Sequence, residues 1–177
     1  MPLGYTSNSV TRHIHAQLFS TEYKIIFTYA LALFIIPLLS PNQIIVGTAV
    51  NALLIKSSIT IRTRKVFLLA LIPSIAVMGG GILFGGLTSS MLIMIPFIWV
   101  ANLVLMLLMK KLFVQKNKEY FFSAVISATT KTILLFSVTF GLLAFSLVPA
   151  VFLTAFGVLQ LITALSGATL VAILKKP

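Results

Sequence analysis

The sequence has no cysteine and almost no acidic residues. Its 177 residues include two glutamates, Glu22 and Glu119, and no aspartate. Without cysteine the chain cannot form a disulfide, an iron–sulfur cluster or a thiolate zinc site. Two glutamates supply neither the paired carboxylates of a glycosidase nor the oxygen ligands of a magnesium or calcium site. We therefore expect a protein that is not an enzyme and needs no metal or cofactor.

Charged residues are scarce too, and the chain contains several long apolar runs. Only 8% of the residues are charged and 59% are hydrophobic, whereas a soluble domain carries about a quarter charged residues. This composition all but excludes a soluble globular fold. The net charge of +11 would indicate nucleic acid in a soluble protein, but in a membrane protein it reflects basic loops on the cytoplasmic side. We expect a lipid bilayer and no nucleic acid among the partners.

Six stretches are apolar enough to be predicted as transmembrane helices. They are residues 23–39, 43–61, 66–84, 91–109, 120–145 and 151–174. The second is the weakest, because Lys56 and two serines follow a short apolar core, and whether it spans fully is left open. The predicted fold is an all-α integral membrane protein. A single six-helix transmembrane domain over 23–176 would follow a polar cytoplasmic tail over 1–22.

The basic residues lie in alternate connections between these stretches. The connections at 62–65 and 110–119 and the C-terminal Lys175-Lys176 are basic, while the other connections carry no charge. Twelve of the 13 basic residues fall on one side if there are six spans with both termini inside. The positive-inside rule therefore predicts a multi-pass protein of the cell (plasma or inner) membrane, with both termini in the cytoplasm.

Lys131 is the exception among the basic residues. It lies eleven residues after Tyr120, about 16 Å along a helix and so near the middle of a hydrocarbon core about 30 Å thick. A charge at that depth is costly and indicates a functional site. Neither glutamate lies deep enough to pair with it. Lys131 is therefore a neutral amine, an ammonium held by amides, hydroxyls and carbonyls, or the counter-charge of an anionic ligand.

Other polar side chains lie at similar depths or in the link at 40–43. Amides in membrane helices often only hold helices together. A cation, an aromatic wall and several converging amides are the expected form of a small-molecule site. The predicted substrate-binding residues are Lys131, Asn102, Gln160, Trp99, Asn51, Asn42 and Gln43.

Four stretches carry a resemblance to known membrane proteins. They are PNQIIVGTAVNALL (41–54), LIPSIAVMGGG (71–81), MIPFIWVANLVLMLL (94–108) and LQLITALSGATLVAIL (159–174). They are similar to a group of six-span membrane proteins that carry the label "iron hydrogenase", which a chain without cysteine cannot be. The six spans, cytoplasmic termini, short outer links and lack of an ATPase motif resemble the S components of energy-coupling factor (ECF) vitamin transporters. The resemblance covers about residues 23–176.

The S-component resemblance implies a bundle with a vitamin-sized site that opens outward. It also implies a transmembrane coupling subunit and two cytoplasmic ATPases, which drive release by toppling the S component in the membrane. Many S components dock through an Ala-x-x-x-Ala pattern on the first helix. The nearest match here is Thr28-x-x-x-Ala32. This departure leaves open whether the pair docks a partner or packs inside the bundle.

We therefore expect the substrate-binding membrane subunit of an importer, which captures a small, anionic, vitamin-like solute. Lys131 would meet its negative group, Asn102 and Gln160 would make directional hydrogen bonds, and Trp99 would wall the site. The alternative is a structural or assembly membrane protein that binds a partner membrane subunit and has no small-molecule ligand.

Overall fold

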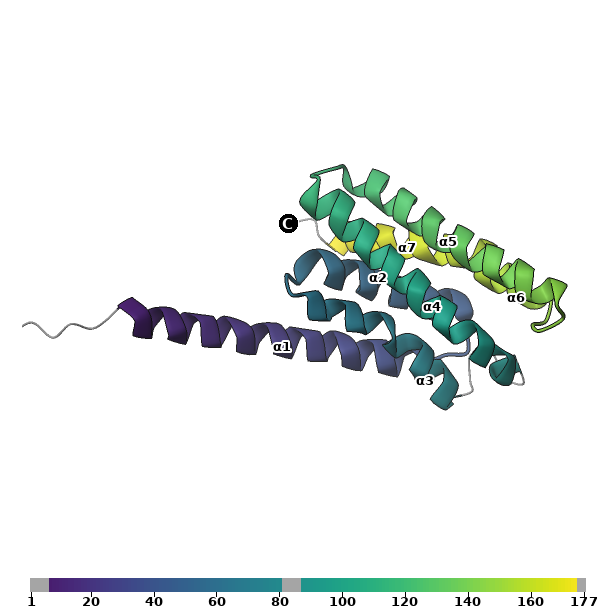
Figure 1. Cartoon of the computed structure of the whole chain (residues 1–177), viewed down its shortest axis with the longest axis horizontal. Coiled ribbons are helices and arrows are strands. Elements are labelled where there is room, and N and C mark those ends of the chain that lie inside the picture. Colours follow the sequence, from purple (N-terminus) through teal and green to yellow (C-terminus); the bar gives the residue numbers. More distant parts are fainter. Residues whose placement is uncertain (1–6, 81–86, 175–177) are drawn as a thin grey trace, which may run out of the picture.

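The structure, a computed structural model, describes residues 7–80 and 87–174 of the chain. Within these ranges every regular element is helical (Figure 1). The elements are α1 (Ser7–Leu39), α2 (Gln43–Thr60), the 3-10 helix η1 (Arg64–Ala70), α3 (Ile72–Gly80), α4 (Thr88–Met109), the π-helix η3 (Lys110–Gln115), α5 (Tyr120–Ala144), α6 (Val151–Phe156) and α7 (Val158–Leu174). The predicted all-helical class is confirmed for this part of the chain.

Five helical segments are long and apolar enough to cross a membrane. They are Thr21–Leu39, Gln43–Thr60, Ser90–Gln115, Tyr120–Ala144 and Val151–Leu174. The stretch that looked weakest in the sequence forms α2, an unbroken helix of 18 residues, which is about 27 Å long. A helical membrane-embedded protein is therefore the class that the described residues support.

The predicted third helix, 66–84, is not one continuous α-helix. Residues 64–70 form a 3-10 helix, and α3 then runs for nine residues from Ile72; residues 81–84 lie outside the described residues. Pro73 is the second residue of α3, a position in the first turn where proline is tolerated because its missing N–H would have no partner there. Neither piece alone meets the length of a span, so the predicted span 66–84 is not among the five.

The last predicted helix is also interrupted, at Gly157 between α6 and α7. The backbone there has φ −102° and ψ −100°, outside the helical region. A Cβ at this position would lie 2.5 Å from the Leu153 carbonyl oxygen and 2.8 Å from the Phe136 ring. Only glycine fits such close approach without a shift of its neighbours.

The first helix is longer than the predicted span. It begins at Ser7 and continues without a break to Leu39, so much of the predicted polar tail is helical. Figure 1 shows α1 extending well beyond the rest of the bundle.

Helix α2 lies at the centre of the bundle, where it contacts α1, η1, α4 and α7. Its closest partner is α7, and two glycines allow the approach. A Cβ on Gly167 would lie 2.8 Å from both the Ala52 nitrogen and the Thr48 oxygen, and a Cβ on Gly47 would lie 2.9 Å from Thr163. Small residues let membrane helices pack backbone to backbone in this way.

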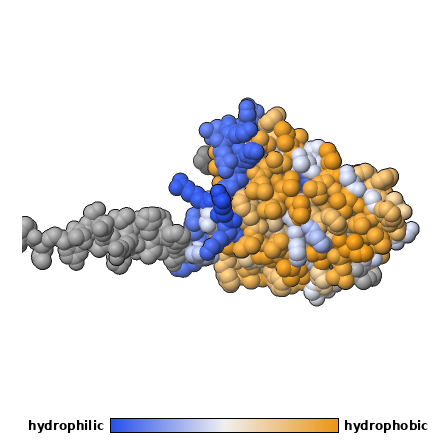
Figure 2. Space-filling view, viewed as in Figure 1, coloured by the Kyte–Doolittle hydropathy of each residue, from blue (hydrophilic) through white to orange (hydrophobic). Residues whose placement is uncertain are grey.

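Many large apolar side chains are exposed on the outside of the bundle. Large side chains such as Phe27 and Phe145 are 69% and 79% exposed. Figure 2 shows the hydrophilic residues gathered at one end of this apolar surface. Two contacts hold the basic links in place there: Lys65 Nζ donates to the Tyr23 hydroxyl of α1 at 2.5 Å, and Lys110 donates to the Arg62 carbonyl at 3.1 Å.

The glycine contact predicts a position-specific effect on stability. We expect Gly167→Ala to destabilise the protein by about 1–3 kcal/mol, because its methyl group meets α2 backbone that cannot rotate away. Thermal unfolding in detergent measures the change.

Gly141 supplies the matched control, because a Cβ there meets no atom within 4 Å. Gly141→Ala should leave the melting temperature unchanged or raise it, since alanine is the better helix former. Equal melting temperatures for Gly167→Ala and the unchanged protein would disprove the close packing of α2 on α7.

Candidate functional site

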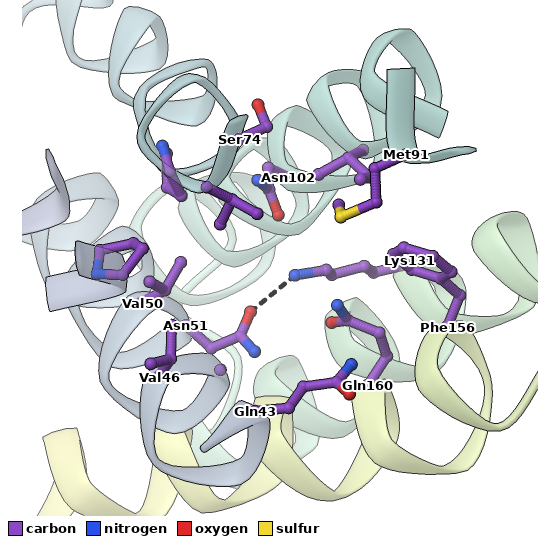
Figure 3. A pocket seen from close by; sticks show the side chains of 15 residues that line it. Gln43, Val46, Val50, Asn51, Ser74, Met91, Asn102, Lys131, Phe156 and Gln160 are labelled. Carbon is purple, nitrogen blue, oxygen red and sulfur yellow. Dashed lines mark hydrogen bonds between the residues drawn. The ribbon is translucent and has the colours of Figure 1, made fainter. Parts of the chain in front are cut away.

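A cavity of about 80 Å³ lies inside the bundle, at the centre of Figure 3. Residues of α1 through α7 line it, so all seven α-helices contribute. Its polar lining residues are Gln43, Asn51, Ser74, Asn102, Lys131 and Gln160. Five of the seven predicted substrate-binding residues are among them: Lys131, Asn102, Gln160, Asn51 and Gln43. Residues far apart in the sequence are thus brought to one place.

Lys131 is the centre of this site. Its side chain is only 2% exposed, and its Nζ donates a hydrogen bond to Asn51 Oδ1 at 2.6 Å (Figure 3). Both glutamates of the chain are among the described residues, and neither lines the cavity. An ammonium has three N–H donors, and within the described residues Asn51 is the one acceptor that it meets. The remaining donors are available to a group that enters the cavity.

The Lys131–Asn51 bond continues into α7. Asn51 Nδ2 donates to Thr163 Oγ1 at 3.2 Å, and that hydroxyl donates to the Gln160 carbonyl at 3.2 Å. The chain of bonds links α5, α2 and α7. Because each group orients the next, it holds the amide oxygen of Asn51 toward the lysine.

Two glutamine amides complete one side of the cavity. Gln43 Nε2 donates to the Ala155 carbonyl at 3.4 Å. Gln160 Oε1 is buried and has no hydrogen-bond partner among the described residues. Figure 3 shows both side chains pointing toward the space beside Lys131. A buried oxygen without a donor is costly, so a donor group in the cavity would be stabilised there.

Asn102 has a structural bond as well as a place in the lining. Its Nδ2 donates to the Ala70 carbonyl at 3.1 Å. That carbonyl ends η1 and would meet the N–H of residue 73 in a continuing 3-10 helix, but proline has none. Asn102, on the neighbouring helix α4, therefore supplies the hydrogen bond that the Ala70 carbonyl lacks at the break between η1 and α3.

Trp99 does not line the cavity. Its indole N–H donates to Ser74 Oγ at 2.6 Å, and Ser74, which does line the cavity, donates in turn to the Leu71 carbonyl at 2.9 Å. The ring lies along a separate shallow groove beside η1. Trp99 therefore acts on the site through Ser74 and is not the aromatic wall that the sequence suggested; Phe156 is the aromatic residue in the lining.

Asn42 also lies outside the cavity, since it caps α2. Its Oδ1 accepts from the backbone N–H groups of Ile44 at 3.0 Å and Ile45 at 3.2 Å. Asparagine is among the preferred residues at this position, so the sequence carried the signal for this structural role.

Ser74, Phe156 and Thr163 contribute to the site and were not among the residues predicted to bind substrate. Thr163 lies three residues after Gln160 and thus on the same helix face, which is a signal that could have found it. Ser74 carried no such signal, because it follows a helix break that the apolar pattern did not show.

The suggested docking pair lies on the most exposed span. Thr28 is exposed and donates to the Lys24 carbonyl of its own helix at 3.0 Å, while Ala32 is half-buried. Only 11% of the span Thr21–Leu39 is buried, against 44% for α2. Thr28 is therefore not used for packing inside the bundle.

Comparison of the chain with protein-family models, with curated proteins and with solved structures finds no match. Conclusions about function therefore depend on the geometry of the site.

The Lys131–Asn51 bond predicts strong coupling between the two side chains. Asn51→Leu should destabilise the protein by at least about 1 kcal/mol, and by more than about 3 kcal/mol if Lys131 is charged. The reason is that it leaves a buried amine or ammonium without an acceptor. Lys131→Met in the same chain should recover much of that loss, since both polar partners are then replaced. Thermal unfolding of the two single variants and the double variant gives the coupling energy. Additive effects would show that the two side chains do not depend on each other.

Proposed function

We propose that the protein is the substrate-binding membrane subunit of an importer, and that its cavity captures a small anionic solute. The observation that carries the proposal is a fully buried lysine beside a cavity that neither glutamate lines. A buried charge is normally paired, and intramembrane lysines mark ligand or ion sites. The negative group of the solute would accept from Lys131, next to Asn51.

The other polar groups indicate what else the solute carries. Gln160 Oε1 lacks a donor, so a solute with an N–H or O–H group several bonds from its negative group would satisfy both ends of the site. Small hydroxy or amino carboxylates, and heteroaromatic carboxylates with a ring N–H, have this combination. The apolar lining from Met91, Ile98 and Phe156 would exclude water around the pair and strengthen it.

The size of the cavity limits the solute. Its volume is about 80 Å³, whereas sites for drug-sized ligands measure about 300–1,000 Å³. In this conformation the site suits a molecule of a few heavy atoms. A vitamin-sized solute would need the surrounding helices to move apart.

The proposed topology keeps six crossings with both termini in the cytoplasm. The seven residues of η1 and the nine of α3 rise about 28 Å together, nearly the thickness of the hydrocarbon core. Residues 64–80 would then be the third crossing, although they are not a single α-helix. The basic links at 62–65 and 110–119 would face the cytoplasm. The cavity, which reaches the first turns of α2 and α4 at Gln43 and Met91, would face outward.

Uptake through such a subunit requires partners. The S-component resemblance suggests a transmembrane coupling subunit and cytoplasmic ATPases, and the exposed face of α1 is the surface we propose for the coupling subunit. The alternative of an assembly protein without a ligand relies on the same face, so only a ligand measurement separates the two.

The topology has a direct test, because the chain has no cysteine of its own. Single cysteines at Lys116 and at Ser146 lie on opposite ends of α5. With six crossings, a membrane-impermeant maleimide added to intact cells should label Ser146→Cys and spare Lys116→Cys until the cells are opened. If residues 64–80 do not cross and the N-terminus is cytoplasmic, this pattern is reversed. With either orientation of the N-terminus, Arg62→Cys and Lys116→Cys then lie on opposite sides of the membrane, whereas six crossings place them on the same side.

The capture of an anion is tested by ligand-dependent stability. We expect a small carboxylate among glycolate, lactate and pyrrole-2-carboxylate, each of which carries an O–H or N–H donor, to raise the melting temperature, while the matching neutral amides do not. Lys131→Met should abolish the rise. Lys56→Met is the control, because Lys56 lies on α2 outside the cavity. An equal rise with Lys131→Met, or no rise with any of these carboxylates, would contradict the proposal.

A further inference from the structure

A second hollow lies at the basic end of the bundle, apart from the Lys131 cavity. It is a groove of about 870 Å³ lined by Arg62 of the link after α2, η1, the C-terminal half of α4, η3 and one residue of α5. Much of its wall is apolar and comes from Phe67, Leu103 and Leu107. Leu107 is 43% exposed, so the wall is open to whatever surrounds the bundle.

The end of the groove at the basic links carries only positive charge. Four basic residues line it, and neither glutamate of the chain does. They are Arg62, Arg64, Lys110 and Lys111. A concentrated positive charge beside an apolar wall is the chemistry that recognises an anionic lipid headgroup at the membrane surface.

Lys110 holds this group of four basic residues in place. Its Nζ donates to the Ile61 carbonyl at 2.8 Å and the Arg62 carbonyl at 3.1 Å, and it lies 5.5 Å from the centre of the Phe67 ring. These contacts fasten the link after α2 to the end of α4. The side chains of Arg62, Arg64 and Lys111 are exposed and, within the described residues, make no hydrogen bond or ion pair. Three cations are thus free to bind.

The depth of the groove matches part of a lipid chain. Leu103 lies seven residues before Lys110, about 10 Å toward the middle of the membrane. Thr130, also in the lining, lies ten residues after Tyr120 on α5, about 15 Å from the same end. The groove therefore runs from the basic end to about half the thickness of a hydrocarbon core of about 30 Å.

We propose that this groove binds an anionic phospholipid. Its phosphate lies against Arg62, Arg64 and Lys111, since guanidinium groups bind phosphate through two parallel hydrogen bonds. One acyl chain lies along Leu103 and Leu107. In the topology proposed above, this is the inner leaflet, where anionic lipids lend the surface its negative potential. The inference does not depend on the solute of the Lys131 cavity.

The test measures the melting temperature of the purified protein in a neutral detergent with added lipid. We expect phosphatidylglycerol, at about 100 times its dissociation constant, to raise it by about 5–10 °C. Phosphatidylcholine and glycerol 3-phosphate should not, because the first lacks net charge and the second lacks an acyl chain. Arg62→Gln/Arg64→Gln should lose most of the rise.

The matched control is Lys116→Gln/Lys118→Gln. Both lysines are exposed in the same basic end but do not line the groove, and the same amount of charge is removed. The control should keep the full rise. Equal losses in the two double variants, an equal effect of phosphatidylcholine, an equal effect of glycerol 3-phosphate, or no rise with phosphatidylglycerol would each overturn the proposal.

Discussion

The hydrogen bond between Lys131 and Asn51 is the interaction on which the interior of the bundle depends. A lysine that is 2% exposed in an apolar bundle needs a hydrogen-bond acceptor. Neither glutamate lines the cavity, and the acceptor is the side-chain amide oxygen of Asn51 on α2. Asn51 lies where α2 packs closely on α7: a Cβ at Gly167 would lie 2.8 Å from α2 backbone and 3.0 Å from the Asn51 Cβ. The glycine contact and the buried lysine are therefore parts of one arrangement.

The polar groups divide the core into two apolar parts. One cluster gathers around Leu54 and Met106, and the other around Met94 and Phe152. On α5, Ala124 belongs to the first cluster and Leu135 to the second, and Lys131 lies between them. The cavity occupies this boundary, and both helix interruptions adjoin it. Irregular backbone inside a membrane is tolerated where it is buried or lines a cavity, so the breaks and the cavity occur together for the same physical reason.

Most of the helices and the depths of the site residues could be predicted, because the depth of a residue in a membrane follows from its position along a helix. The apolar lengths indicated five of the helices, and a rise of about 1.5 Å per residue brought Lys131, Asn51 and Gln160 to similar depths. The rotation of a helix about its axis could not be predicted in the same way. In a membrane both the lipid-facing and the core-facing sides are apolar, so periodicity gives no direction. The sequence therefore did not show that Trp99 contacts Ser74 from outside the cavity. Nor did it show the break before Pro73, because the residues on both sides of it are apolar.

The most direct measurement is native mass spectrometry of the protein, purified in mild detergent from cells grown in rich medium, beside Lys131→Met prepared in the same way. The account predicts a small-molecule adduct in the unchanged protein, of the mass of a compact carboxylate and released on denaturation. It predicts none in Lys131→Met. Identical spectra for the two proteins would contradict the claim that Lys131 holds an anionic solute.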